Sequence, residues 1–192
     1  MLAPDEKYKH IIATDISAKS ISKAQNLAEK YGASVDCRVC DGLEKAPETT
    51  LAVMCGIGGN EIIKILENSK YCGKMILQPV PTADDLREYL LKHNYHIAKD
   101  YVIYDEKKFY FVFVIDGVGK NNYSKIEKQF GKTNIQEMSQ DFVMYLENQI
   151  NKLKFLENFD ITDISDNSKK DIKQKQQYLL NAKKLLGEVK ND

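Results

Sequence analysis

The sequence predicts an α/β protein with a mostly parallel sheet, followed by a helical region. Short apolar runs alternate with helical patterns up to residue 104, and a strongly β-forming run, 109–115, follows a charged turn. Beyond Gly117-Val118-Gly119 only helical patterns occur. This alternation is typical of a parallel sheet, and the terminal hairpin adds one antiparallel strand. We therefore expect an α/β domain over 1–118 and a helical domain over 119–192.

The composition narrows the class of protein. The chain has 192 residues, of which 43% are hydrophobic and 29% charged, which is typical of a globular protein. Lys+Arg and Asp+Glu both number 28, so a uniformly basic nucleic-acid binder is disfavoured, although a local basic patch is not. No apolar run approaches the roughly 20 residues that span a bilayer, and 1–9 is polar. We expect no membrane association.

The four cysteines indicate a reduced, cytoplasmic protein, because no signal sequence accompanies them. Cys37 and Cys40 form a C-x-x-C, but they lie in a strand-like stretch and no second pair has matching spacing. We therefore expect ordinary thiols at these positions and no metal site.

The first half of the α/β region contains two expected strands on either side of a helix. The first strand covers 10–14, and Ser17 is a candidate N-cap for the helix that follows. The apolar residues of that helix recur at helical spacing up to Tyr31, and Gly32 is a plausible stop. The second strand covers 35–39.

The second half adds two strands, two helices and a hairpin. The expected strands cover 51–54 and 74–77, and a helix over 60–66 lies between them. Thr82 can cap the next helix. A charged turn, 105–108, then joins two strands, of which the more β-forming one should be buried within the sheet because an exposed edge of that kind aggregates.

The helical region shows two amphipathic stretches separated by a polar break. Apolar residues recur at helical spacing over 142–156 and again over 172–189, and the break covers 160–168. This pattern indicates a helical hairpin or a short coiled coil appended to the sheet.

Small, polar or acidic residues follow three of the expected strands. Asp15 follows the first strand, the glycine-rich turn 55–59 follows the third, and Gln78-Pro79 follows the fourth. Open α/β sheets bind ligands at such strand ends, and glycines let the backbone approach a ligand closely. A ligand-binding site at this edge is therefore our leading hypothesis.

Each of these positions also has a purely structural interpretation. Asp15 can cap the helix that begins near Ser17, and Asp41-Gly42 can form an ordinary turn. The glycine-rich turn can serve only as a strand-to-helix connection, and Gln78 can be a satisfied polar residue at a strand end.

The order of these motifs resembles one enzyme family. Asp15, Asp41-Gly42-Leu43, Gly56-Ile57-Gly58-Gly59 and Leu77-Gln78-Pro79, followed by a hairpin and a helical pair, are similar to the bacterial tRNA (adenine(22)-N(1))-methyltransferases. The resemblance covers most of 11–117 through motifs and the remaining helices only through their pattern. It implies a Rossmann-like class I methyltransferase sheet with a C-terminal coiled coil, S-adenosylmethionine as cofactor and tRNA as substrate.

The resemblance also implies roles for individual residues. Asp15, next to Ile16, would accept hydrogen bonds from the cofactor ribose, and Asp41-Gly42 would lie beside the cofactor adenine. The methionine part and its methyl group would lie against the glycine-rich turn, through Cys55, Gly56, Gly58 and Gly59. Gln78 and Pro79 would lie near the target base as the catalytic positions.

The sequence departs from this family at two places. The family begins with a strand and a glycine-rich loop that hold the methionine part, and no such sequence precedes Ile11 here. In the expected strand order 3-2-1-4-5-7-6 this strand is central. The sheet would then close by pairing its second and fourth strands, or the chain would dimerise, or it would be a fragment. Val80 stands where the family has an asparagine that can hydrogen-bond a base edge.

A lysine-rich stretch is the candidate RNA-binding surface. A helix that carries this many lysines can contact phosphate groups along an RNA strand, although the lysines can equally form a solvent-exposed face. The residues are Lys169, Lys170, Lys173, Lys175, Lys183 and Lys184.

Three functional hypotheses follow. The first is a methyltransferase that modifies N1 of adenine in tRNA. The second is a non-catalytic RNA-binding or assembly protein derived from such an enzyme, and the third is a related methyltransferase with another substrate.

Overall fold

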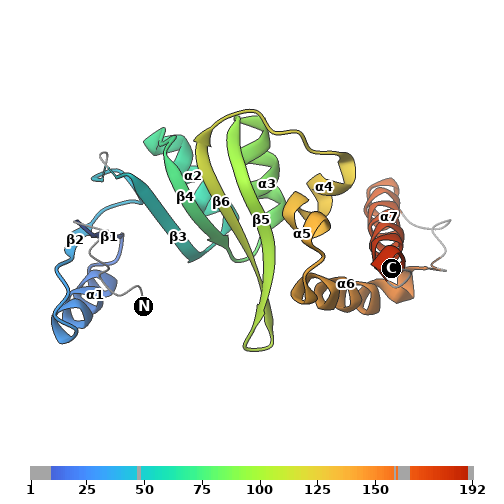
Figure 1. Cartoon of the computed structure of the whole chain (residues 1–192), viewed down its shortest axis with the longest axis horizontal. Helices are drawn as coiled ribbons and strands as arrows, with labels where there is room; N and C mark the ends of the chain where they lie inside the picture. The colour runs from blue at the N-terminus through green and yellow to red at the C-terminus, as the bar shows by residue number, and fades with distance from the viewer. Residues whose placement is uncertain (1–9, 47–48, 158, 160–164, 190–192) are drawn as a thin grey trace.

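The computed structural model describes residues 10–46, 49–157, 159 and 165–189 (Figure 1). In the first part the elements are β1 (Ile12–Asp15), α1 (Ala18–Lys30), β2 (Asp36–Val39), β3 (Leu51–Ile57), α2 (Gly59–Ser69), β4 (Lys74–Pro79), α3 (Ala83–Lys92), β5 (Tyr95–Asp105) and β6 (Lys108–Val118). The second part contains α4 (Lys125–Phe130), α5 (Lys132–Glu137), α6 (Gln140–Leu153), a 3₁₀ turn (Lys154–Leu156) and α7 (Asp166–Val189). The predicted alternation of strands and helices, followed by helices alone, is confirmed.

The strands form two sheets rather than one. β1 pairs with β2 in parallel, and the second sheet has the order β3-β4-β6-β5. In that sheet β3 and β4 are parallel, whereas β6 is antiparallel to both of its neighbours. β6 is therefore internal, and Phe113 and Ile115 on it are buried. The expectation that this β-forming run lies within the sheet is confirmed.

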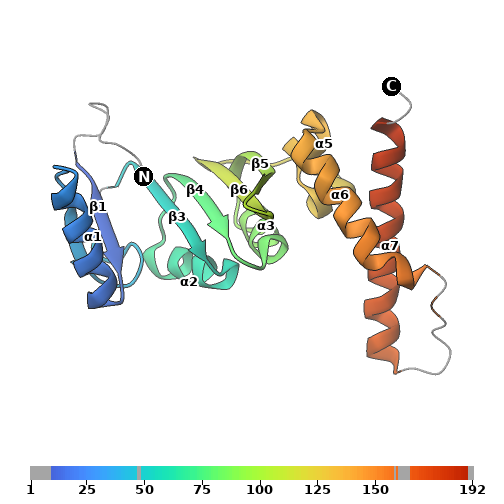
Figure 2. The same cartoon turned by 90° about the horizontal axis from the view of Figure 1, so that it is seen from below.

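A break separates β1 from β3. Among the described residues β1 pairs only with β2, and β3 pairs only with β4. Figure 2 shows a gap between β1 and β3, whose arrowheads point to the same edge, and no backbone ladder joins the two strands among the described residues. The alternative in which the sheet closes by pairing these two strands is therefore wrong for the described residues. One edge of β1 and one edge of β3 have no strand partner there.

The described helices cover only one face of the larger sheet. In Figure 1 α2 and α3 lie behind β3, β4 and β6, and no described helix lies in front of these strands. Alternate side chains on the covered face form the core, among them Met75 and Leu77 of β4 and Leu86 and Leu90 of α3, all completely buried. Side chains of the open face stay accessible, as Val53 on β3 illustrates with 47% exposure.

A second core joins the helical region to the sheet. Val102 of β5 packs with Phe130 of α4, Phe142 of α6 and Ala182 of α7. The predicted pair of long helices is confirmed, because α6 and α7 pack together through this cluster. The predicted polar break is partly wrong, because α7 already includes 166–168, while 160–164 lie outside the described residues.

The first turns of α1, α2 and α3 agree only in part with the predicted caps and first residues. Ser17 caps α1 as predicted, since its hydroxyl accepts from the Ser20 backbone N–H at 3.3 Å. α2 begins at Gly59 rather than at Asn60. Thr82 precedes α3 but does not cap it, because its hydroxyl donates instead to the Pro81 carbonyl at 2.7 Å.

Candidate functional site

The carboxyl ends of β1, β3 and β4 lie at the same edge of the molecule (Figure 2). The Cys40 backbone N–H donates to the Asp15 carbonyl at 3.1 Å, which joins the ends of β1 and β2. The Val80 N–H donates to the Ile57 carbonyl at 2.8 Å and joins the ends of β3 and β4. The structure therefore brings the predicted site residues to one edge, in two groups on either side of the break.

One carboxylate oxygen of Asp15 accepts a hydrogen bond from a neighbouring residue, and the other is available to a ligand. Its Oδ1 accepts from the Ser17 backbone N–H at 2.7 Å, which forms a local turn before α1. The interpretation of Asp15 as the helix cap is wrong, because Ser17 itself caps α1. No described residue bonds to the other oxygen, Oδ2, which can accept a ligand hydroxyl. The neighbouring Ile16 projects into solvent with 75% exposure.

Gly56 is the glycine that suits close approach of a ligand. It lies inside β3, since the strand continues to Ile57 instead of ending at Met54 as predicted. A bulge occurs there, and Gly56 adopts φ 75°. A Cβ at Gly56 would meet no heavy atom within 4 Å, so the backbone has open space beside it.

Packing explains two of the other three glycines of the predicted site, Gly42 and Gly59. A Cβ at Gly59 would fall against the Thr82 carbonyl oxygen, and one at Gly42 would collide with the side chain of Ile65 on α2. A Cβ at Gly58 would meet the Glu61 carboxylate. Gly59 and Gly42 thus let α2 approach its neighbours closely, whereas the contact at Gly58 involves only the movable end of a side chain of α2 itself.

Cys55 and Gln78 complete this edge. Desolvation raises the pKa of the Cys55 thiol, which keeps the sulfur protonated and weakly nucleophilic near neutral pH. The Gln78 side-chain oxygen accepts from the Gly56 backbone N–H at 2.9 Å, so Gln78 holds the bulge of β3 in place. Pro79 is buried at the end of β4. The predicted catalytic roles of Gln78 and Pro79 stay predictions.

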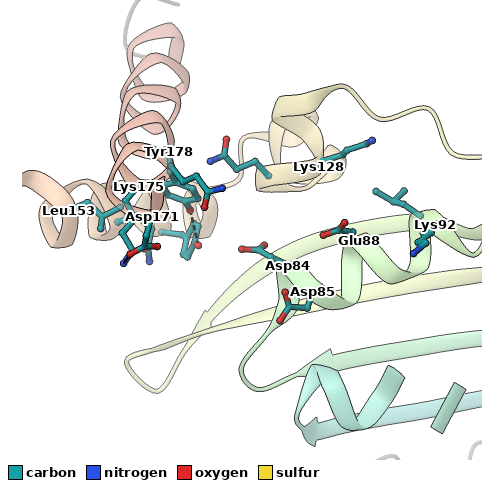
Figure 3. Close-up of a pocket in the computed structure, with 14 residues that line it drawn as sticks. Asp84, Asp85, Glu88, Lys92, Lys128, Leu153, Asp171, Lys175 and Tyr178 are labelled. Carbon is teal, nitrogen blue, oxygen red and sulfur yellow. Dashed lines mark hydrogen bonds and ion pairs between the residues drawn. The ribbon is translucent and has the colours of Figure 1, made fainter. Parts of the chain in front are cut away.

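Two hollows lie where the helical region meets α3. The first has a volume of about 780 Å³, and Figure 3 shows Asp84 and Glu88 of α3 across from Lys175 and Tyr178 of α7. The second has a volume of about 670 Å³ and lies beside the end of β4, where Pro79 forms part of its wall. Sequence reasoning did not find either hollow, because their walls come from elements far apart in the chain.

The predicted RNA-binding lysines do not all share one face of α7. Successive helical residues are about 100° apart, and Lys175 falls on the side that lines the first hollow, where it pairs with Asp171 at 2.7 Å. Lys183 pairs with Glu157 at 2.6 Å. The remaining lysines lie with Lys183 on the side away from the buried Ala182, and they are Lys169, Lys170, Lys173 and Lys184.

Metal and membrane features are not found in the described part of the chain. No group of three or more His, Cys, Asp or Glu side chains there could hold a metal ion, and Cys37 and Cys40 are free thiols. None of the described helices is both long and apolar enough to cross a bilayer.

Comparison with known proteins decides the family. The family model described as tRNA (adenine(22)-N(1))-methyltransferase matches residues 1–187. The chain belongs to this family. A Bacillus subtilis protein named tRNA (adenine(22)-N(1))-methyltransferase is 32% identical over 120 residues, a stretch that covers 58% of this chain and 50% of that relative. The match thus spans about half of the relative's length.

Solved structures support the same fold. The Streptococcus pneumoniae protein Sp1610 superposes with a TM-score of 0.79 at 26% identity, over 93% of this chain and 82% of that one. A second structure of Sp1610, in complex with S-adenosyl-L-methionine, superposes with a TM-score of 0.73 at 25% identity, over 93% and 81%. The predicted Rossmann-like methyltransferase architecture of the family is confirmed.

Proposed function

We propose that this chain transfers a methyl group from S-adenosylmethionine to N1 of an adenine in tRNA. The observation that carries the proposal is the family match over residues 1–187, combined with the positions of Asp15, Asp41 and Gly56 at or just after the ends of β1, β2 and β3. The matched relative is named for this reaction at adenine 22.

The residues at the strand ends suit this cofactor. The available Oδ2 of Asp15 would accept from ribose hydroxyls, and the exposed Asp41 would accept from the adenine amine. The open backbone at Gly56 would lie against the methionine part, and the raised pKa of the Cys55 thiol beside it disfavours a competing thiolate. When bound, the cofactor supplies an activated methyl group on its sulfonium sulfur.

The reaction needs little acid–base chemistry from the protein. N1 of adenine carries a lone pair, so no proton has to leave before it attacks the methyl carbon. The protein's main task is to hold N1 in line with the methyl group and to keep the base out of its pair. Gln78 would contribute by fixing the bulge at Gly56, and the lysine face of α7 would bind tRNA phosphates. A cytoplasmic location and a coiled-coil arrangement of α6 and α7 are parts of the same proposal.

One observation favours a second candidate function. Among the described residues no strand pairs with the free edge of β1 or with that of β3, so no described strand covers the methionine end from that side. A non-catalytic RNA-binding protein derived from the same enzyme would tolerate this break.

Methyl transfer to tRNA separates the two candidates. The purified chain would be incubated with radiolabelled S-adenosylmethionine and an unmodified tRNA transcript, and the product nucleosides identified by mass spectrometry. We expect 1-methyladenosine, and a transcript lacking the target adenine should stay unlabelled. RNA binding without any transfer, together with no heat of S-adenosylhomocysteine binding in calorimetry, would favour the non-catalytic protein. Transfer to ribosomal RNA or to small molecules instead would favour the third hypothesis.

A further inference from the structure

The hollow beside β4 is built from both parts of the chain. Its volume of about 670 Å³ falls within the range of roughly 300–1,000 Å³ that is usual for ligand sites. Its walls come from the connection 79–85, the β5–β6 hairpin at 107–111 and α6 at 145–152. Since Pro79 and Val80 belong to it, the hollow adjoins the strand end where we place the target base.

Aromatic packing fixes the wall that α6 provides. The Tyr145 ring makes edge contacts with Phe109 at 5.5 Å and with Phe111 at 5.1 Å between ring centroids. Its hydroxyl is hydrogen-bonded to the Tyr178 hydroxyl of α7 at 3.0 Å. The hollow is therefore a preformed feature in which α6 and α7 are held against β6.

Three lysine side chains line this hollow. Lys107 and Lys108 lie at the hairpin and Lys152 on α6, and none of them forms an ion pair with any described residue. On the opposite wall Asp84 is paired with Arg87 at 2.9 Å, which leaves Asp85 as the acid without a salt bridge. The lining is thus net positive and suits phosphate groups.

A buried acceptor without a partner lies in the same wall. The side-chain oxygen of Asn148 is inaccessible to solvent and accepts no hydrogen bond from the described residues. Such an atom costs about 1–3 kcal/mol unless something donates to it. The Asn148 amide would have to rotate toward the hollow for a base amine or a ribose 2′-hydroxyl to supply the missing donor. The partly exposed Tyr110 adds an aromatic surface for stacking.

We propose that this hollow holds the RNA strand next to the target adenosine. Lys107, Lys108 and Lys152 bind phosphates, and Asn148 accepts a hydrogen bond from a base amine or a ribose hydroxyl. Unpaired lysines, an aromatic surface and a buried acceptor together match single-stranded or looped RNA better than a duplex or a protein. The inference rests on the proposed function, and it implies that substrate binding requires α6 to be packed on the sheet.

Charge reversal tests the lysines. The variant Lys107→Glu/Lys108→Glu/Lys152→Glu is compared with Lys19→Glu/Lys23→Glu/Lys64→Glu, which changes the same charge at exposed positions of α1 and α2. Binding of an unmodified tRNA transcript is measured by fluorescence anisotropy across a salt series. We expect at least tenfold weaker binding in the first variant and a salt slope smaller by about 2, because three phosphate contacts are lost. Equal binding by the two variants would overturn the proposal.

Asn148→Ala tests the acceptor separately from folding. We expect RNA affinity to fall about two- to tenfold while the melting temperature stays the same or rises, because the Asn148 oxygen has no partner in the free protein. A lower melting temperature with unchanged RNA affinity would show a purely structural role and contradict the proposal. Duplex RNA of similar length is the control ligand, and it should bind the parent and variant equally.

Cofactor binding keeps this inference distinct from the proposed function. S-adenosylhomocysteine binding is measured by calorimetry on the same charge-reversal proteins and should be unaffected. If the chain binds tRNA through this hollow but neither binds the cofactor nor transfers methyl groups, the proposed function fails and this inference stands. If methyl transfer persists with an unchanged KM for tRNA in the Lys107/Lys108/Lys152 variant, the inference fails and the function stands.

Discussion

Arg87 Nε lies 3.2 Å from Asp100 Oδ2, and each of the two side chains is only 1% exposed. This buried ion pair joins α3 to β5. Asp100 also accepts from the Thr133 backbone N–H of α5 at 2.9 Å, and Arg87 donates to the Lys128 carbonyl of α4 at 3.3 Å. The pair therefore connects the larger sheet to the first two helices of the helical region.

Removing one member of this pair should be costly. Arg87→Met leaves the Asp100 charge buried without its partner, and we expect the free energy of unfolding to fall by about 3–5 kcal/mol. Arg87→Met combined with Asp100→Asn should recover part of this loss, because no unpaired charge remains and Asn can still accept from Thr133. Urea unfolding of both proteins checks the prediction, and a double variant that is no more stable than the single one would contradict it.

Replacing Gly59 of α2 with alanine should mainly affect stability, whereas replacing Gly56 of β3 should mainly affect ligand binding. Gly59→Ala pushes a methyl group against the Thr82 carbonyl and should lower the melting temperature markedly. Gly56→Ala meets no neighbouring atom, so its stability cost is limited to about 1–2 kcal/mol of left-handed backbone strain. We expect Gly56→Ala to lose S-adenosylhomocysteine binding despite folding. Thermal melts and calorimetry give both readouts, and normal binding by Gly56→Ala would exclude close approach at this glycine.

Asp15 should contribute to ligand affinity more than to folding. Asp15→Asn keeps an oxygen for the Ser17 N–H but weakens acceptance from ribose hydroxyls, so cofactor affinity should fall about tenfold to a hundredfold. Ser17→Ala is the control, because it removes the cap of α1 at a cost of about 1 kcal/mol and touches no ligand position. Equal affinities in the two variants, measured by calorimetry, would assign Asp15 a structural role alone.

The rate at which the Cys55 thiol is alkylated should depend on pH and should report on cofactor binding. Its raised pKa means that thiolate is scarce at pH 7, so alkylation by iodoacetamide should accelerate as pH rises through and beyond the usual thiol range. S-adenosylhomocysteine should slow the reaction at every pH. Mass mapping follows Cys55 in a Cys37→Ser/Cys72→Ser background, and rates insensitive to the ligand would place it away from Cys55.

The lysine face of α7, which lies away from the buried Ala182, should contribute to RNA affinity through its charge. Lys169→Glu/Lys170→Glu/Lys173→Glu should weaken tRNA binding and reduce its salt dependence, because phosphate contacts release counterions. The α1–α2 charge-reversal variant described above is again the matched control. Anisotropy titrations that coincide with the control would identify this face as a solvated surface.

Elements with their own local pattern were predictable, whereas long-range contacts were not. Ser17 and the hairpin turn at 105–108 depend on residues a few positions apart, so the sequence shows them directly. The extension of β3 to Ile57 depends on its ladder with β4, which overrides the turn character of the glycines. The hydrogen bond from the Gly56 backbone N–H to the Gln78 side chain depends on the register of β3 and β4. The hollow lined by Lys152 depends on how α6 packs against the sheet. No local signal carries such information.

The separation of the two sheets has a consequence for cooperativity. Within 12–39, which contains β1, α1 and β2, Ile21 is the only buried side chain, and this unit shares no backbone ladder with the larger sheet among the described residues. Such a unit opens at much lower free energy than the rest of the domain unfolds. A ligand that bridges Asp15 and Gly56 would therefore couple two independently opening pieces into one. Part of its binding energy would be used in that ordering, and amide hydrogens of α1 would exchange more slowly once it is bound.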